Sequence, residues 1–491
     1  MALSPSLFFT VIVLYFIILL LISYFTSKNS SNQTYFNGNK QSLWYLVAFG
    51  MLSDSLSGVT YISVPGAVLN SSLTYLQVVF GYFLGYFVII FILLPLYYRL
   101  NLISIYTYLR QRFGINAQKT GSFYFLLSRL LGAGGRLMLA IGVMQLFIFD
   151  HYHIPFALTT TVFIALMLVY TYKGGIRTLV FTDAFQSFFL ILGVCLSIYA
   201  IANHLNFSFN DILKTIETSK YNQVIETNIL AKNHWIKHVL GGAFFTIAMT
   251  GLDQNMMQKN LSMKTLKEAQ KNIFWFSIVM VIVNVLFISL GILLYHFAEV
   301  KQISFELNSN GKVITDNVFP MLALNHFGTI ASLAFILGLT AATFSSADSV
   351  LATLTTSFCI DFLGFDNTKL NEEKQHKIRN KIHIGFSILL LLIIIGLKEF
   401  SDGKSTIDFI LSIATYTYGP LIGLFFIGLY SKLSFKDKFI PIICIFPPII
   451  CYYLSQNSAN WFNGYQLGNE IIILNGLITV ILLIFISKKS V

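Results

Sequence analysis

The stretch AATFSSADS, residues 341–349, places a carboxylate and three serines inside a long apolar run. A charged side chain at the depth of a bilayer costs about 2.5–3.5 kcal/mol or more, so Asp348 is a functional candidate by default. Hydroxyl and carbonyl oxygens suit a hard monovalent cation, although serines in a helix can also simply bond back to their own backbone. In a helix, one stripe would carry Ala342, Ser345, Ser346 and Ser349, with Asp348 beside it.

A second carboxylate, Asp183, occurs in KGGIRTLVFTDAFQ, one or two turns into another apolar run. Taken alone, Asp183 is also consistent with a carboxylate near a helix start at the membrane interface. Two carboxylates in helices that meet repel each other unless a cation or a proton lies between them. Asp183 and Asp348 are therefore candidates for a cation or proton site.

Two apolar segments are interrupted by glycines and polar residues. Residues 46–69 carry glycines and a proline around the polar centre SDSLS, and residues 241–260, five spans later, carry Asp253. Interrupted helices at matching positions of two halves are typical of secondary transporters with inverted repeats, in which unwound backbone faces ions and solute. Close helix packing at small residues is the alternative explanation. The repetition favours the first interpretation.

Membrane-spanning helices must position these residues. The chain has 491 residues, of which 56% are hydrophobic and only 11% are charged, and a soluble protein of this size needs a more charged surface. Apolar runs of about 20 residues, the length that spans hydrocarbon, recur throughout. We therefore predict an all-α polytopic membrane protein. The formal charge of +11 reflects topology rather than nucleic-acid binding, and the four cysteines, which lack metal-ligand spacing, are predicted to be core residues.

Hydropathy predicts thirteen transmembrane helices. With the N-terminus outside, 22 basic residues fall on inward-facing loops and eight on outward-facing loops, as the positive-inside rule describes. The first run lacks a basic start and is followed by Lys28, so we predict a span and not a cleaved signal peptide. We expect a multi-pass protein of the plasma (inner) membrane with a cytoplasmic C-terminus. The predicted spans are 6–26, 43–68, 74–98, 122–149, 154–172, 178–202, 236–257, 272–298, 327–361, 382–398, 405–431, 439–455 and 469–487.

The whole chain is predicted to form one transmembrane domain, because its longest hydrophilic stretches are outward loops. Its predicted parts are an extra N-terminal helix and loop (6–42), a first repeat (43–202), an outer loop (203–235), a second repeat (236–431) and two C-terminal helices (432–491).

Six local motifs follow one another along the chain: YFNGNKQSLW, SLSGVTYISVPG, ISIYTYLRQRFG, KGGIRTLVFTDAFQ, GLDQNMMQKNLSMKTLKEAQKN and ATFSSADS. In this order they resemble the sodium:solute symporter family, and the resemblance covers nearly the whole chain. It implies a LeuT-type core of two inverted five-helix repeats.

The resemblance also implies a sodium site between the broken first helix and the eighth helix of the core. In the family this site takes backbone carbonyls from two residues of the first helix, and one small residue and two adjacent hydroxyls from the eighth. The matching residues here are Ser53, Leu56, Ala342, Ser345 and Ser346.

Some members hold a second sodium nearer the cytoplasm, and those members typically have a hydroxyl at the position of Asp348. The carboxylate here either tightens that site or carries a proton. One or two sodium ions are therefore expected as coupling ions, with no organic cofactor. The matching positions for the second site are Asp183, Ser345, Asp348 and Ser349.

Arg136 matches an arginine that holds the substrate carboxylate in the sialic-acid-transporting members. The alternative is a structural arginine paired with Asp54 or a backbone carbonyl, and Arg129 is expected to be structural. The glutamine of the sialic acid members is out of register, so sialic acid itself is not supported. The expected solute is a sugar, an amino acid or a carboxylate. Candidate solute-binding residues are Ser55, Ser57, Thr60, Tyr75, Gln77 and Arg136, with Phe80 on the same wall.

Asp54, Asp253 and Gln254 are expected to form gate contacts. The lysines that follow, Lys259 first, either make cytoplasmic gate or loop contacts or lie on a solvated helix face, and the solvated face is the favoured interpretation. We expect a monomeric sodium-coupled symporter that imports a small polar organic solute by alternating access, and not an enzyme. Proton coupling through Asp183 and Asp348 is the alternative. An intramembrane enzyme would need histidines and carboxylates clustered at one membrane face, whereas the nine histidines are scattered.

Overall fold

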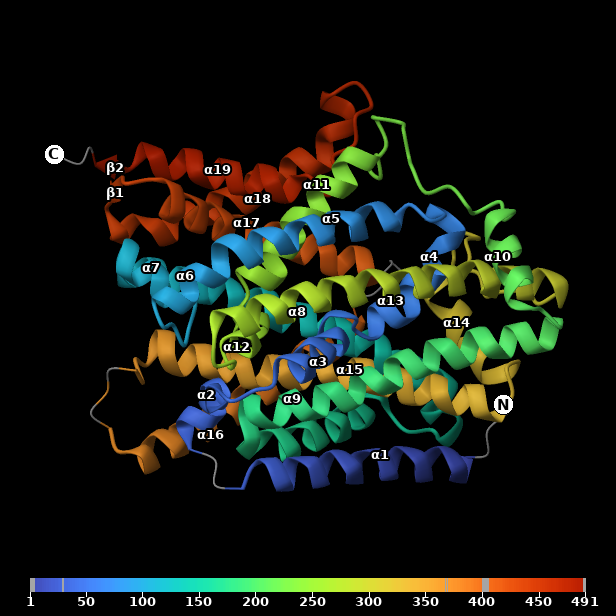
Figure 1. The fold of residues 1–491 in the computed structure, drawn as a ribbon. Coiled ribbons are helices and arrows are strands. Elements are labelled where there is room, and N and C mark those ends of the chain that lie inside the picture. The colour runs from blue at the N-terminus through green and yellow to red at the C-terminus, as the bar shows by residue number, and fades with distance from the viewer. Residues whose placement is uncertain (1–4, 29–30, 367, 369, 400–405, 489–491) are drawn as a thin grey trace.

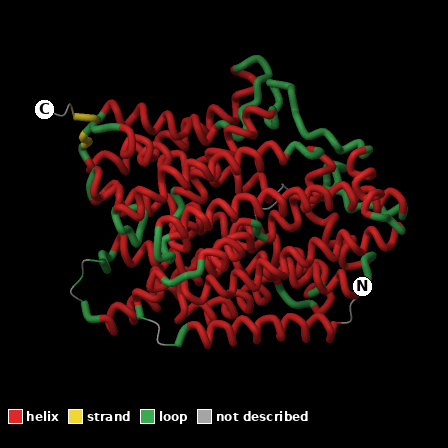
Figure 2. The backbone as a smooth tube through the Cα atoms, in the orientation of Figure 1, coloured by secondary structure: helices red, strands yellow, loops and turns green. Residues whose placement is uncertain are grey.

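The computed structural model describes residues 5–28, 31–366, 368, 370–399 and 406–488. Within them the chain is almost entirely helical. Long helices run roughly parallel to one another in one bundle (Figure 1), and two short strands near the last described residues pair antiparallel (Figure 2). The first helix begins at one end of the bundle and the last described strand lies at the opposite end.

The helices and strands, in chain order, are α1 (Pro5–Thr26), α2 (Asn32–Asn37), α3 (Trp44–Ser55), α4 (Gly58–Ser71), α5 (Tyr75–Val88), α6 (Leu94–Arg99), α7 (Thr107–Arg112), α8 (Ile115–Phe147), α9 (Phe156–Leu205), α10 (Phe209–Glu217), α11 (Trp235–Thr246), α12 (Gln254–Asn260), α13 (Leu266–Val300), α14 (Thr315–Asn325), α15 (Thr329–Ser357), α16 (Glu372–Glu399), α17 (Thr406–Tyr430), β1 (Ser434–Phe435), α18 (Ile440–Trp461), α19 (Ile471–Phe485) and β2 (Ser487–Lys488).

Many of these helices are suited to a bilayer. Among the described residues, nine are long and apolar enough to cross a membrane, and the bent pair of α3 and α4 would make ten. The segment Phe156–Tyr172 and α19 are apolar but shorter. The prediction of a polytopic helical membrane protein is therefore confirmed, while the count of thirteen spans stays a prediction.

Several helices begin earlier than hydropathy predicts: α16 begins at Glu372 rather than at 382, and α13 begins at Leu266 rather than at 272. α8 begins at Ile115 rather than at 122, because its polar first turn is capped from another part of the chain. The carboxylate of Asp437 accepts hydrogen bonds from the backbone N–H groups of Asn116 and Ala117 at 2.9 and 2.8 Å. Hydropathy detects the apolar part of a helix and cannot detect a turn that is held by such a cap.

Three helices are interrupted. α3 and α4 are bent by 59° around Leu56 and Ser57, which lie outside both helices. Between α11 and α12 the chain forms a wide π-helical turn, Ile247–Gly251, followed by two non-helical residues. α9 breaks at Gly175, whose φ of 53° favours glycine. The first two interruptions fall in the segments where the sequence predicts them.

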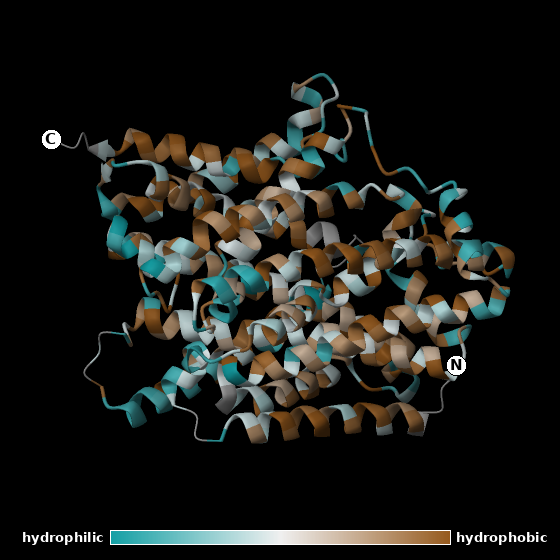
Figure 3. Ribbon diagram, viewed as in Figure 1, coloured by the Kyte–Doolittle hydropathy of each residue, from teal (hydrophilic) through white to brown (hydrophobic). Residues whose placement is uncertain are grey.

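α15 lies at the centre of the bundle and contacts α3, α4, α8 and α9. Of its most apolar window, 83% is buried inside the protein, compared with 22% for α16 and for α18. Brown, hydrophobic residues also run along α1 and α19 at two edges of the bundle (Figure 3). A buried central helix can carry polar side chains that a lipid-facing helix cannot.

Candidate functional site

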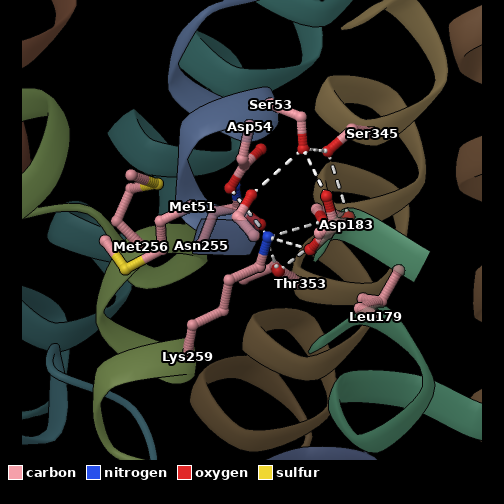
Figure 4. A network of polar contacts seen from close by, with 12 residues as sticks. Met51, Ser53, Asp54, Leu179, Asp183, Asn255, Met256, Lys259, Ser345 and Thr353 are labelled. Atoms are coloured by element: carbon pink, nitrogen blue, oxygen red, sulfur yellow. Dashed lines mark hydrogen bonds and ion pairs between the residues drawn. The ribbon is translucent and has the colours of Figure 1, made fainter. Parts of the chain in front are cut away.

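The broken helix pair and α15 meet at two serines. Ser53 Oγ lies 2.7 Å from Ser345 Oγ, and Ser345 Oγ donates to Asp183 Oδ1 at 3.0 Å. Figure 4 shows these three side chains converging from α3, α15 and α9. All three residues are fully buried. The family resemblance predicts that α3, α9 and α15 meet at the ion sites, and in the structure Ser53, Asp183 and Ser345 bring these three helices into contact.

The end of α3 also brings backbone carbonyls near Ser53. The last carbonyls of a helix have no partner one turn further on, and α3 ends at Ser55. Ser53 lies in this last turn, and Leu56 follows outside the helix. Ala342 and Ser346 are fully buried on α15, where Ser346 Oγ donates to the Thr343 carbonyl at 3.0 Å.

Gly58 brings the start of α4 against the same stretch of α15. A Cβ atom at this position would meet Thr343 Oγ1 at 2.8 Å and Ala140 Cβ at 3.2 Å. Only glycine allows this approach without a shift of its neighbours. The five residues of the first predicted sodium site therefore come from two elements in direct contact.

Lys259 is not on a solvated helix face, and this expectation is wrong. The residue is 1% exposed, and its Nζ lies 2.5 Å from Asp183 Oδ2 and 3.0 Å from Asp54 Oδ2. Its ammonium also donates to Ser349 Oγ at 2.9 Å. α12 is short and follows the break after α11, so it carries this lysine into the interior rather than into a loop (Figure 4).

Asp348 faces a different partner from Asp183. Its Oδ2 accepts a hydrogen bond from Tyr170 Oη at 2.7 Å, and its Oδ1 accepts from the Ser349 backbone N–H at 2.5 Å. The carboxylate is fully buried. Of the four residues matched to a second sodium site, Ser345 and Ser349 both contact Asp183. The side chain of Asp348 instead bonds to Tyr170.

A cavity of about 100 Å³, lined by both polar and apolar side chains, lies against the break between α3 and α4. A wider cavity of about 400 Å³ shares Tyr75 and Leu411 with it and reaches Asn233 in the loop before α11. Five of the predicted solute-binding residues line the smaller cavity: Ser55, Ser57, Thr60, Tyr75 and Arg136.

The other two residues predicted for the cavity wall do not line it. Gln77 is buried elsewhere, and Phe80 is 56% exposed on the outside of the bundle. The reason is helix geometry, because residues two or five positions from Tyr75 point to other faces of α5. The cavity is lined from α5 by Tyr75, Tyr82 and Tyr86, whose spacings of seven and four residues follow one helix face and could have identified them.

The two arginines of α8 have different surroundings. Arg129 Nε lies 2.6 Å from Asp253 Oδ2, and its Nη2 donates to the Met249 carbonyl at 2.9 Å, as expected for a structural arginine. Arg136 also lines the cavity, and among the described residues its buried Nε has no hydrogen-bond partner. Among the described residues no hydrogen bond joins Asp54 to Arg136: Asp54 Oδ2 accepts from Asn255 and Lys259, and Asp54 Oδ1 has no partner.

Two of the predicted gate residues, Asp253 and Gln254, connect several elements of the bundle. Asp253 caps α12 through the Met256 N–H and also accepts from Tyr418 Oη at 2.5 Å. The side-chain amide of Gln254 bonds to Ile103 O at 2.7 Å and to Ile105 N at 2.9 Å, in the loop after α6. These contacts tie α12 to α8, α17 and that loop.

Interrupted membrane helices that bring buried hydroxyl and carboxylate groups close to a cavity are typical of ion-coupled secondary transporters. The comparisons with known proteins specify the family. A model described as the sodium:solute symporter family matches residues 35–435, and the chain belongs to this family. Membership confirms the prediction of a sodium-coupled symporter and of sodium as coupling ion, and it favours sodium over proton coupling.

Among known relatives, the sodium/sialic acid symporter NanT of Aliivibrio fischeri is 22% identical over 477 residues, covering 93% of this chain and 89% of that protein. The mouse sodium-coupled monocarboxylate transporter 2 is 22% identical over 408 residues, covering 82% of this chain and 64% of that protein. A solved Na+-coupled sialic acid symporter, in a substrate-bound outward-open state, matches with a TM-score of 0.82 at 19% identity and covers 98% of this chain and 99% of that one. The last similarity establishes the fold.

Proposed function

We propose that the protein imports a small organic solute with a carboxylate group together with sodium, as a monomeric transport unit with its N-terminus outside. The observation that carries this proposal is Arg136, a buried guanidinium on the cavity wall whose Nε has no hydrogen-bond partner in the described part of the chain. Arg129 is paired with Asp253, so its charge is already compensated. Arginine binds a carboxylate through two parallel hydrogen bonds, and relatives named for sialic acid and for monocarboxylates both carry such anions.

The proposed sodium site consists of the Ser53 and Leu56 carbonyls, Ala342 and the hydroxyls of Ser345 and Ser346. Sodium bound there would bridge α3 and α15 and hold the cavity in its outward-facing form. A ligand shifts such an equilibrium only by its difference in affinity for the two forms, so sodium must bind the outward-facing form more tightly. The thirteen crossings and the two inverted five-helix repeats of a LeuT-type core are part of the same proposal.

Ser345→Ala is expected to raise the sodium concentration for half-maximal uptake about tenfold, a loss of about 1.4 kcal/mol of binding free energy. The measurement is uptake into proteoliposomes over a range of external sodium, at constant ionic strength. Thr340→Val is the matched control, because the Thr340 hydroxyl on the same helix bonds to the Ile336 carbonyl. Unchanged sodium dependence in Ser345→Ala would exclude this residue as a ligand.

Arg136→Gln is expected to weaken uptake of the preferred carboxylate about 10- to 100-fold, since a hydrogen bond to a charged group contributes about 1.5–3 kcal/mol. A panel of labelled monocarboxylates, sialic acid, amino acids and sugars is first tested for sodium-driven uptake. Each carboxylate that is transported is then compared with its neutral amide or methyl ester. Preference for a neutral sugar over every carboxylate, or equal loss of acid and ester in Arg136→Gln, contradicts the proposal.

A further inference from the structure

α12 carries a positive charge into the region where the family resemblance places a second sodium. The ammonium group of Lys259 lies 2.5 Å from Asp183 Oδ2 and 3.0 Å from Asp54 Oδ2, and it donates to Ser349 Oγ at 2.9 Å. An ammonium group has three hydrogens to donate. Three acceptors, from α3, α9 and α15, use all of them, and Figure 4 shows the nitrogen at the centre of this network.

These contacts involve the same oxygens that a second sodium would need. Asp183 and Ser349 belong to the predicted second site, and both contact Lys259. The other oxygen of Asp183, Oδ1, accepts from Ser345. A sodium ion on Asp183 Oδ2 would therefore lie directly beside a buried ammonium group, and two cations at such a distance repel strongly where water is absent.

With Asp348 protonated, the local charges balance with one ion. Asp54 and Asp183 contribute two negative charges and Lys259 contributes one positive charge, so one negative charge is left. A single sodium at the first site, which reaches Asp183 through Ser345, compensates it. Asp348 directs its carboxylate oxygens to Tyr170 and to the Ser349 backbone. It therefore does not bind the sodium of the first site.

We propose that Lys259 is a cation supplied by the chain itself, which takes the place of the second sodium, so that the protein binds and moves one sodium ion per cycle. The proposal rests on sodium binding at the first site, as proposed above. In this proposal Lys259 sets the number of sodium ions transported per solute. Its charge stays with the protein throughout the cycle, whereas the sodium ion binds and is released.

Equilibrium binding of ²²Na⁺ to the purified full-length protein tests this assignment without knowledge of the solute. Choline keeps the ionic strength constant, and the bound ions are counted per protein at saturation. The wild-type protein is expected to bind one ion. Lys259→Met is expected to bind two, because Asp183 and Ser349 become free, and the double variant Lys259→Met with Asp183→Asn is expected to return to one.

Two further variants serve as controls. Lys271→Met removes the nearby exposed lysine at the start of α13, which lies against the Trp44 ring, and is expected to keep one ion. Ser346→Ala removes a proposed ligand of the first site only. In an otherwise wild-type protein it is expected to lower the affinity for the single bound sodium ion.

The outcomes separate the two proposals. Binding of two sodium ions to the wild-type protein would contradict the proposed role of Lys259 but not the first sodium site. This measurement tests the proposal even if Lys259→Met cannot be purified. A folded Lys259→Met variant that still binds one ion also overturns it. No saturable sodium binding to the wild-type protein contradicts the sodium site on which the inference rests.

Discussion

Arg129→Met is expected to lower the free energy of unfolding by about 3–5 kcal/mol, the range for removing one partner of a buried ion pair. Arg129 and Asp253 have side chains that are only 7% and 0% exposed. Without the guanidinium, the partners that Asp253 keeps within the described ranges are the Tyr418 hydroxyl and the Met256 N–H. A buried carboxylate with neutral donors alone is far less stable than one that faces a cation. The measurement is the fraction of monodisperse protein after heating in detergent.

The double variant Arg129→Met with Asp253→Asn is expected to recover much of this loss, because it removes the uncompensated charge. Lys220→Met is the surface control. Lys220 and Glu299 lie 2.7 Å apart but have side chains that are 60% and 63% exposed, so breaking this pair should change stability by less than about 1 kcal/mol. A double variant no more stable than Arg129→Met, or equal losses at both pairs, would show that buried charge is not the cause.

Gly81→Leu is expected to destabilise the packing of α5 on α11 by about 1–3 kcal/mol or more, the usual effect of overpacking a tight contact. Gly81 and Gly85 form a GxxxG pattern, which lets two helix backbones approach closely in a membrane. A Cβ at Gly81 would meet the Val239 carbonyl and, at 3.0 Å, Gly242 Cα. Since these atoms are backbone, they cannot rotate away. Yield of folded protein and thermal stability in detergent are the measurements.

Gly142→Ala provides the contrast. Gly142 lies in α8, and a Cβ there meets nothing within 4 Å. Alanine is favoured over glycine inside a helix by about 1 kcal/mol, so this variant should be neutral or slightly stabilised. Comparable losses in Gly142→Ala and Gly81→Leu would indicate a general intolerance of these helices to substitution rather than a specific close contact.

The sequence allowed the helical membrane architecture to be predicted because apolar runs of spanning length are a strong physical signal. The broken segments were predictable for a similar reason, since glycine, proline and serine at the centre of a span disfavour a continuous helix. The contact of Ser53 with Ser345 and Asp183 depends on packing between distant segments. It was expected only through the family resemblance, which supplied the pairing of the elements.

Lys259 was misassigned because it opens a run of lysines that otherwise fits an inner loop. Its burial follows from the short α12, whose position after the break cannot be inferred from hydropathy. A signal was nevertheless present. The predicted spans contain Asp54, Asp183 and Asp348, and buried carboxylates require a nearby positive group, so a search for that group would have reached Lys259. The pairing of Arg129 with Asp253 was missed in the same way.

The proposed replacement of a second sodium by Lys259 would also limit how steeply the cell can accumulate the solute. One sodium ion and one monovalent anion together carry no net charge, so the membrane voltage does not drive their entry. The largest inside-to-outside ratio of the anion then equals the outside-to-inside ratio of sodium. A second sodium would square that ratio and add electrical work of about 2.3 kcal/mol for each 100 mV. With Lys259 in the proposed role and a monovalent carboxylate as the solute, transport would be electroneutral and would suit a solute that is plentiful outside or consumed quickly inside.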